Sequence, residues 1–208
     1  LDPAMFDAPL TAFVNAASPR VGAGLGPIAR VVATGETIYR RKLSFAEAEA
    51  RIAACWRPYH AALAALITAT VRQFGCCLLI DCHSMPAQAP SLGRLRPADV
   101  VLGDAHGTSC AGLAARRVED GLARIGLTVR RNEPYAGGYV TRHYGRPREG
   151  VHAIQMELAQ RAYLAAEAAP RAYDPGRAGR LRGVLGPILA GLDRLARSGA
   201  LTDRRTPQ

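Results

Sequence analysis

The chain has 208 residues, about half of them apolar, and a formal net charge of +10. This length suffices for one domain with a substantial core, and the composition is that of a folded rather than a disordered protein. No apolar run approaches the length of a bilayer span, so we expect no membrane partner. The arginines that dominate the basic charge are scattered and not interleaved with aromatic residues, which predicts a solvated basic surface and no nucleic-acid partner.

The five cysteines form no CxxC pair, and most of them lie in or beside apolar runs. An odd number of cysteines without a metal-binding or redox spacing is typical of reduced thiols. We therefore expect mostly buried, reduced cysteines in a cytoplasmic protein.

The first third of the chain predicts an irregular segment followed by a long helix. Residues 1–43 are rich in Pro and Gly and give no regular pattern. In "SFAE", Ser44 can cap a helix while Glu47 reaches back to it, which is a capping box. The helical pattern then runs to Gly75, and Pro58 inside it predicts a kink or two abutting helices.

The remainder alternates between strands and helices. The apolar run 78–80 predicts a strand, residues 87–99 a loop, "VVLGDAHGTSC" a short strand with a Gly-rich turn, and "AGLAARRVEDGLARIG" an amphipathic helix. After them come a strand in "LTVRRN", a long polar loop over residues 133–150, a strand in "VHAIQMEL" and a closing helix from "PGRAGRLRG" onward. This order predicts an α/β sandwich with a mixed or parallel sheet, folded as a single domain over residues 1–208.

The strand in "CCLLIDCHSMP" ends on groups that are costly to bury without partners. Strand alternation puts Leu79, Asp81 and His83 on one face, so His83 would emerge at the end of the strand with Asp81 behind it. This arrangement suits a metal-ligating imidazole with a supporting carboxylate. An equally simple interpretation is that His83 bonds a turn and Asp81 caps the next segment.

A second candidate lies in "GVHAIQMEL", where Gln155 and Glu157 share one face of the predicted strand. A glutamate at such a position is a candidate general base if its surroundings raise its pKa. The alternative is a salt bridge to one of the many arginines. We predict that His152, on the more apolar face, is a structural histidine.

Two loops offer further polar groups. The first, "GDAHGTSC", carries Asp104 and His106 beside glycines that allow a ligand to approach the backbone. The second, over residues 132–145, carries Asn132, Tyr135, Arg142, His143 and Tyr144, and an arginine can grip a carboxylate with two hydrogen bonds. The alternative is a solvated loop in which Arg142 pairs with a nearby acid. A Ser109 or Cys110 nucleophile lacks a neighbouring base in the sequence.

In their order along the chain, "WRPYH", "DCHSMP", "GDAHGTSC", "NEPYAGGYVTRHYGRP" and "VHAIQMEL" resemble the N-formylglutamate amidohydrolase (deformylase) family. The resemblance implies a three-layer α/β sandwich with a central mixed sheet, similar to zinc carboxypeptidases and aspartoacylases. It also implies hydrolysis of N-formyl-L-glutamate, or of a related N-acyl amino acid, to formate and the amino acid in histidine breakdown.

The resemblance further assigns roles to individual residues. It implies one catalytic zinc ion bound by His83, and Glu157 as the carboxylate that activates the attacking water. The substrate would be held by Asn132, Tyr139, Arg142 and His143, with support for the site from Asp81, Asp104, His106 and Gln155.

The opening "LDPAMFDAPL" resembles family sequence downstream of the other zinc ligands, so we expect an N-terminally shortened domain that can lack zinc. The alternative function is that of a metal-free, non-catalytic relative that binds a carboxylate ligand.

Overall fold

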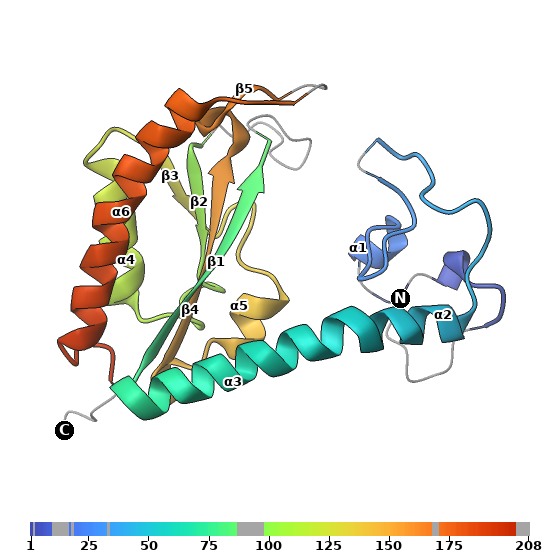
Figure 1. Cartoon of the computed structure of the whole chain (residues 1–208), viewed down its shortest axis with the longest axis horizontal. Helices are drawn as coiled ribbons and strands as arrows, with labels where there is room; N and C mark the ends of the chain where they lie inside the picture. The colour runs from blue at the N-terminus through green and yellow to red at the C-terminus, as the bar shows by residue number, and fades with distance from the viewer. Residues whose placement is uncertain are drawn as a thin grey trace. The chain divides into compact units, whose positions relative to one another are not determined.

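The computed structural model describes residues 1, 3–9, 17, 19–32, 34–86, 98–167 and 171–202. Internal contacts divide the chain into two compact units, Leu1–Leu63 and Ala64–Gln208. Each unit is described by itself, and Figure 1 gives the course of the chain through both. Within the described ranges, no helix is long and apolar enough to cross a membrane.

The first unit holds the short helices η1 (Pro3–Met5), α1 (Pro19–Gly22) and α2 (Phe45–Arg51). Its buried core consists of Met5, Phe6, Ile28, Leu43 and Ala48. The predicted capping box of α2 is confirmed. The Ser44 hydroxyl accepts a bond from the Glu47 N–H at 3.3 Å, and the Glu47 carboxylate accepts one from the Ser44 N–H at 2.9 Å.

The predicted irregularity at Pro58 is a π-helical turn. Helix α2 continues through η2 (Ile52–Trp56) into α3 (Arg57–Phe74), and the Arg57 N–H bonds to the Ile52 carbonyl, five residues back. Proline has no N–H to donate, and its ring crowds the carbonyl four residues earlier. A wider turn just before it relieves that crowding. The helix stops before Gly75, as predicted, and this glycine has a positive φ of 80°.

The second unit is built on a mixed four-stranded sheet, as predicted. Its strands are β1 (Cys77–Met85), β2 (Val100–Gly103), β3 (Val129–Arg131) and β4 (Val151–Ala159), in the spatial order β1-β4-β2-β3. Strands β1 and β4 run parallel, β2 and β3 run parallel, and β2 and β4 run antiparallel. Strand β1 is longer than predicted, because pairing with β4 extends it through Met85.

Helices α4 (Gly112–Ala123) and α6 (Pro175–Arg197) lie side by side and cover one face of this sheet (Figure 1). The main core lies between them and the sheet. Its largest fully buried side chains are Val100, Leu102, Val118, Leu122, Ile154 and Leu192. Apolar residues at helical spacing in α4 and at strand spacing in β2 and β4 meet here, which is why these predicted elements are confirmed.

The opposite face carries less cover. Helix α5 (Tyr139–Tyr144) packs against β4, and a small cluster forms from Met85, Ala98, Val101 and Ala159 with Tyr135 against it. The prediction of one long polar loop over residues 133–150 is wrong, since this stretch contains α5 and the 3-10 turn η4 (Pro147–Glu149). The turns are stabilised by burial of Thr141 and Tyr144, which sequence periodicity over six residues cannot reveal.

Three smaller elements follow β4: η5 (Gln160–Ala162), β5 (Leu164–Ala166) and β6 (Ala172–Tyr173), the last two paired antiparallel. They were not predicted, because strands of two or three residues carry too few side chains for a pattern. The loop predicted over 87–99 falls outside the described residues except for Ala98 and Asp99. Three of the five cysteines are buried as expected, but Cys55 and Cys82 are exposed.

Candidate active site

Four polar side chains share one face of the two longest strands. Strand register places Asp81 beside Gln155 and His83 beside Glu157. Neighbours in register on parallel strands point to the same face, and here it is the face opposite the α4–α6 core. His83 was predicted to lie at the end of the strand, and it lies two residues before Met85, the last residue of β1. The predicted sharing of a face by Asp81 and His83 agrees with this register.

His83 and Asp81 form a direct pair. The His83 Nε2 lies 3.1 Å from the Asp81 Oδ1, and the side chains are 48% and 17% exposed, respectively. A half-exposed imidazole is thus held by a largely buried carboxylate on its own strand. Such a carboxylate fixes the orientation of the ring and leaves its other nitrogen for a ligand or substrate.

Glu157 is buried and is held by Gln155. The Gln155 Nε2 donates to the Glu157 Oε1 at 2.8 Å, and Glu157 is only 8% exposed. Burial raises the pKa of the Glu157 carboxyl, nearby Asp81 raises it further, and His83 and the Gln155 bond oppose that shift. No arginine among the described residues forms an ion pair with it, so the salt-bridge interpretation finds no support. A carboxylate that holds a proton more tightly than usual is suited to accept one from water.

Gly103 allows a loop to reach this pair of residues. It lies opposite Gln155 on β2, and a Cβ atom there would stand 2.6 Å from the Gly137 nitrogen and 2.7 Å from the Ala136 carbonyl carbon. The close approach lets the Gly138 N–H donate to the Gln155 Oε1 at 2.8 Å. Gln155 therefore joins the start of α5 to Glu157 through hydrogen bonds on both sides.

Asp104 and Asn132 form a second cluster at the ends of β2 and β3. The Asn132 Nδ2 donates to Asp104 Oδ1 at 2.8 Å, while the Asn132 Oδ1 accepts from the backbone N–H groups of Asp104 and His106 at 3.0 and 3.3 Å. Arg131, predicted only as part of a strand, places its Nε 3.3 Å from the buried Asp104 carboxylate. The only hint in the sequence was a charged residue within a short predicted strand. Arg131 supplies the positive charge that a buried carboxylate requires.

Helix α5 presents the remaining predicted substrate residues. Tyr139 and His143 stand one helical turn apart, and their rings stack with centroids 4.7 Å apart. Arg142 and His143 occupy the last turn and are exposed. The structure thus brings Tyr139 and His143 together, places Arg142 beside them in sequence, and gives Asn132 a different set of partners.

Three other polar residues have structural roles. The Ser109 hydroxyl donates to the Ala153 carbonyl at 2.8 Å, and burial raises the pKa of the Cys110 thiol to about 12. His152 is buried, with its Nδ1 accepting from the Ala111 N–H at 3.1 Å and its Nε2 2.7 Å from the Leu201 carbonyl oxygen. The prediction of a structural histidine is confirmed, and neither Ser109 nor Cys110 is prepared to act as a nucleophile.

The donor set for a metal ion is incomplete in the part of the chain that the structure describes. No group of three or more His, Cys, Asp or Glu side chains there is placed to hold one. His83 and its carboxylate neighbours offer fewer convergent ligands than the three that a catalytic zinc needs. These residues alone do not fit a complete zinc site.

The polar face, the loop from residue 132 onward and the order of these motifs agree with a known family, whose pattern matches residues 1–164 and is described as N-formylglutamate amidohydrolase. The chain belongs to the N-formylglutamate amidohydrolase family. It is 38% identical over 161 residues to the N-formylglutamate deformylase of Pseudomonas aeruginosa, a match that covers 76% of this chain and 60% of that protein. The deformylase of Pseudomonas putida is 35% identical over 146 residues, which cover 69% of this chain and 55% of that one.

Solved structures agree with this membership. The crystal structure of N-formylglutamate amidohydrolase from Ralstonia eutropha matches with a TM-score of 0.79 and 33% identity, over 95% of this chain and 71% of that one. A gene product of Agrobacterium tumefaciens has a TM-score of 0.57 at 21% identity, covering 80% of this chain and 64% of its own, which supports the fold alone. The chain spans between half and two thirds of the length of the curated relatives that it matches.

Proposed function

We propose that this protein hydrolyses the linear amide of N-formyl-L-glutamate, or of a related N-acyl amino acid. Family membership and the names of the relatives support this reaction class. The observation that carries the proposal is the pair His83 and Glu157, side by side on the sheet face that α5 adjoins. One is a half-exposed imidazole oriented by Asp81, and the other is a buried carboxylate with a raised pKa.

In this proposal Glu157 acts as the general base. It removes a proton from a water molecule while the water oxygen bonds to the formyl carbon, and it passes that proton to the amide nitrogen as the C–N bond breaks. The products are formate and the free amino acid. Gln155 holds the Glu157 carboxylate in place through its 2.8 Å bond, and Asp81 holds the His83 ring.

Arg142 is the strongest candidate for holding the substrate. Its guanidinium is exposed at the end of α5 and can bind a carboxylate with two parallel hydrogen bonds. The stacked rings of Tyr139 and His143 lie on the same helix and would form one side of the substrate site. Asn132 contributes through the loop that it holds rather than by direct contact, because its amide oxygen and nitrogen are both engaged with Asp104 and His106. Asp104 and His106 then support the site as parts of that loop.

A zinc ion remains part of the proposal, with His83 as the ligand that this chain supplies. When bound, such an ion lowers the pKa of water and polarises a carbonyl oxygen. Its other ligands are not found among the described residues, so no step above depends on it. The proposal also includes a single domain over residues 1–208 with a three-layer fold similar to zinc carboxypeptidases, and a cytoplasmic role in histidine breakdown.

The test separates a hydrolase from a carboxylate-binding relative without catalysis. Glutamate release from N-formyl-L-glutamate is measured with the purified chain, beside formate release, binding of the same compound by calorimetry and zinc content by elemental analysis. N-acetyl-L-glutamate serves as the matched substrate control, and its turnover is followed by the same release of glutamate. Turnover that exceeds that of the acetyl compound supports the proposal. Binding without any formate, in protein supplied with zinc, would assign the chain to the non-catalytic alternative.

A further inference from the structure

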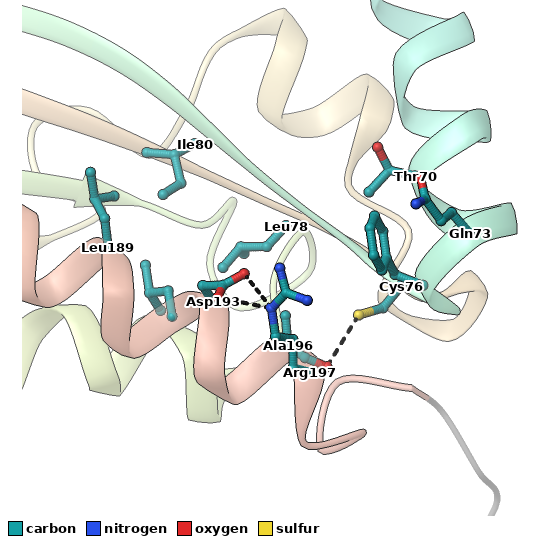
Figure 2. Close-up of a pocket in the computed structure, with 11 residues that line it drawn as sticks. Thr70, Gln73, Cys76, Leu78, Ile80, Leu189, Asp193, Ala196 and Arg197 are labelled. Atoms are coloured by element: carbon teal, nitrogen blue, oxygen red, sulfur yellow. Dashed lines mark hydrogen bonds and ion pairs between the residues drawn. The ribbon is translucent and has the colours of Figure 1, made fainter.

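Grooves lie on both flanks of helix α6, and they differ in how their charges are paired. The larger groove, of about 630 Å³, lies beside β1, and there the Arg197 Nε is 2.9 Å from the Asp193 carboxylate (Figure 2). The smaller groove, of about 330 Å³, lies between α6 and α4 and is called the α4–α6 groove below. Its lining includes Arg117, Arg124 and Arg194 and the apolar side chains of Ile125, Pro187 and Ile188.

Three positive charges gather at the α4–α6 groove. Arg117, Arg124 and Arg194 are distant in the sequence and come together because α4 packs against α6. Among the described residues, none of these three guanidinium groups forms an ion pair or a hydrogen bond, and no acidic side chain lines the groove. Like charges without a counterion repel one another, so an anion is favoured at this place.

Two of the arginines converge beside Gly191. The place that a Cβ atom would take on this glycine is 3.6 Å from the Arg117 Nε, 3.8 Å from the Arg117 Nη2 and 3.8 Å from the Arg194 Nη2. Arg117 thus presents its Nε–Nη2 edge, which can donate two parallel hydrogen bonds to an oxyanion. Two guanidinium groups at one place match the nearly double negative charge of a phosphate monoester better than the single charge of a carboxylate.

The middle of the groove is apolar. Ile188 of α6 packs over Gly121 of α4, where an added Cβ atom would stand 2.9 Å from the Ile188 Cγ1, and the exposed Ile125 lies further along. Arg124 follows Arg117 by about two helical turns, or roughly 10 Å along the helix axis. The groove therefore has an apolar floor between charged ends, and its volume lies in the range of small-molecule sites.

We propose that the α4–α6 groove binds a small phosphate monoester. Arg117 and Arg194 hold the phosphate beside Gly191, and the apolar group of the ligand lies along Ile188 toward Ile125. The phosphate belongs to a free small molecule, because the headgroup of a bilayer lipid carries no apolar group beyond its phosphate that could cover this floor. The groove lies on the helix-covered side of the sheet, opposite the candidate active site, so the inference does not depend on the proposed hydrolysis.

The test is calorimetric titration of the intact 208-residue chain with phenyl phosphate at one fixed ionic strength. The proposal predicts saturable binding of one molecule per chain, at least about tenfold tighter than that of inorganic phosphate, and no binding of phenol. Equal affinity for phenyl phosphate and inorganic phosphate would show attraction by charge alone and overturn the proposal. Binding to vesicles that contain phosphatidic acid, without binding of phenyl phosphate, would assign the charges to a lipid surface and overturn it as well.

Charge-matched variants locate the site. Arg117→Gln and Arg194→Gln should each weaken phenyl phosphate binding at least about tenfold. Arg116→Gln removes the same charge from an exposed position of α4 outside the groove and should change the affinity less than about twofold. Equal weakening by all three variants would contradict a defined site. Arg142→Gln should leave the affinity unchanged, and loss of binding in that variant alone would place the phosphate in the candidate active site instead.

Gly191→Ala tests the groove without changing any charge. Its methyl group would stand at ordinary contact distances of 3.6–3.8 Å from the Arg117 and Arg194 guanidinium atoms, so the fold should persist, as the urea midpoint would show. The methyl group would occupy the place between the two arginines and should weaken binding at least about fivefold. Gly179→Ala, on the same helix but outside the groove, should bind as the unaltered chain does. Unchanged affinity in Gly191→Ala would show that the phosphate does not lie there.

Discussion

Gly103→Ala should weaken the contacts that hold Gln155 and Glu157 in the candidate active site, although Gly103 itself carries no functional group. The added Cβ would stand 2.6 Å from the Gly137 nitrogen and 2.7 Å from the Ala136 carbonyl carbon. Both are backbone atoms and cannot swing aside as the tip of a side chain could. Segment 136–138 must therefore move away from the sheet. That movement would stretch or break the 2.8 Å bond from the Gly138 N–H to Gln155, which in turn holds Glu157.

The cost can be assembled from three contributions. Overpacking of this kind destabilises by about 1–3 kcal/mol. Loss of one hydrogen bond adds roughly 1 kcal/mol. Alanine lowers the conformational entropy of the unfolded chain, and this stabilises the folded state by about 0.4–1 kcal/mol. The free energy of unfolding should therefore fall by roughly 1–4 kcal/mol, measured by urea denaturation.

Gly179→Ala is the matched control. Gly179 lies inside α6, is exposed, and has no neighbouring atom within 4 Å of the place that an added methyl group would occupy. The same substitution there should stabilise by up to about 1 kcal/mol through helix propensity alone. The site is monitored by the exchange rate of the Gly138 amide, which should rise in Gly103→Ala and stay unchanged in the control. A Gly103→Ala protein with unaltered stability and an unaltered Gly138 amide would refute the reasoning.

Three further outcomes follow from buried groups. His152→Phe leaves two backbone groups without partners and should lower unfolding free energy by about 1–3 kcal/mol for each, measured in urea. Because the pKa of Glu157 is raised in the folded state, wild-type stability relative to Glu157→Gln should fall as pH rises above 4.5; a pH-independent difference in urea titrations would contradict this. Iodoacetamide should label exposed Cys55 and Cys82 before buried Cys110, and peptide mass spectrometry would show early Cys110 labelling if its burial were wrong.

Much of the second unit could be predicted because its patterns are long. The apolar alternation in β4 and the helical spacing in α4 each repeat often enough to fix the element and its buried face. The shared face of Asp81 with His83, and of Gln155 with Glu157, also follows from alternation alone. Strand pairing then brings the two sets together, and that step depends on register, which local sequence does not encode.

Other parts depend on contacts between distant residues. Helix α5 has only six residues, and it is fixed by Thr141 and Tyr144 packing into the unit rather than by any repeat of its own. The extension of β1 through Met85 needs β4 beside it. The countercharge from Arg131 to Asp104 and the close approach at Gly103 join segments roughly thirty residues apart, so no local pattern could indicate them.

The most direct test of the proposed chemistry is the rate of formate release from N-formyl-L-glutamate by Glu157→Gln beside the unaltered protein. The glutamine retains an oxygen that can accept the Gln155 bond, so fold and substrate binding should survive. Loss of a general base predicts a rate at least about 100-fold lower, with substrate affinity little changed. A variant that releases formate at the rate of the unaltered protein would show that Glu157 is not the base and that the proposed site is wrong.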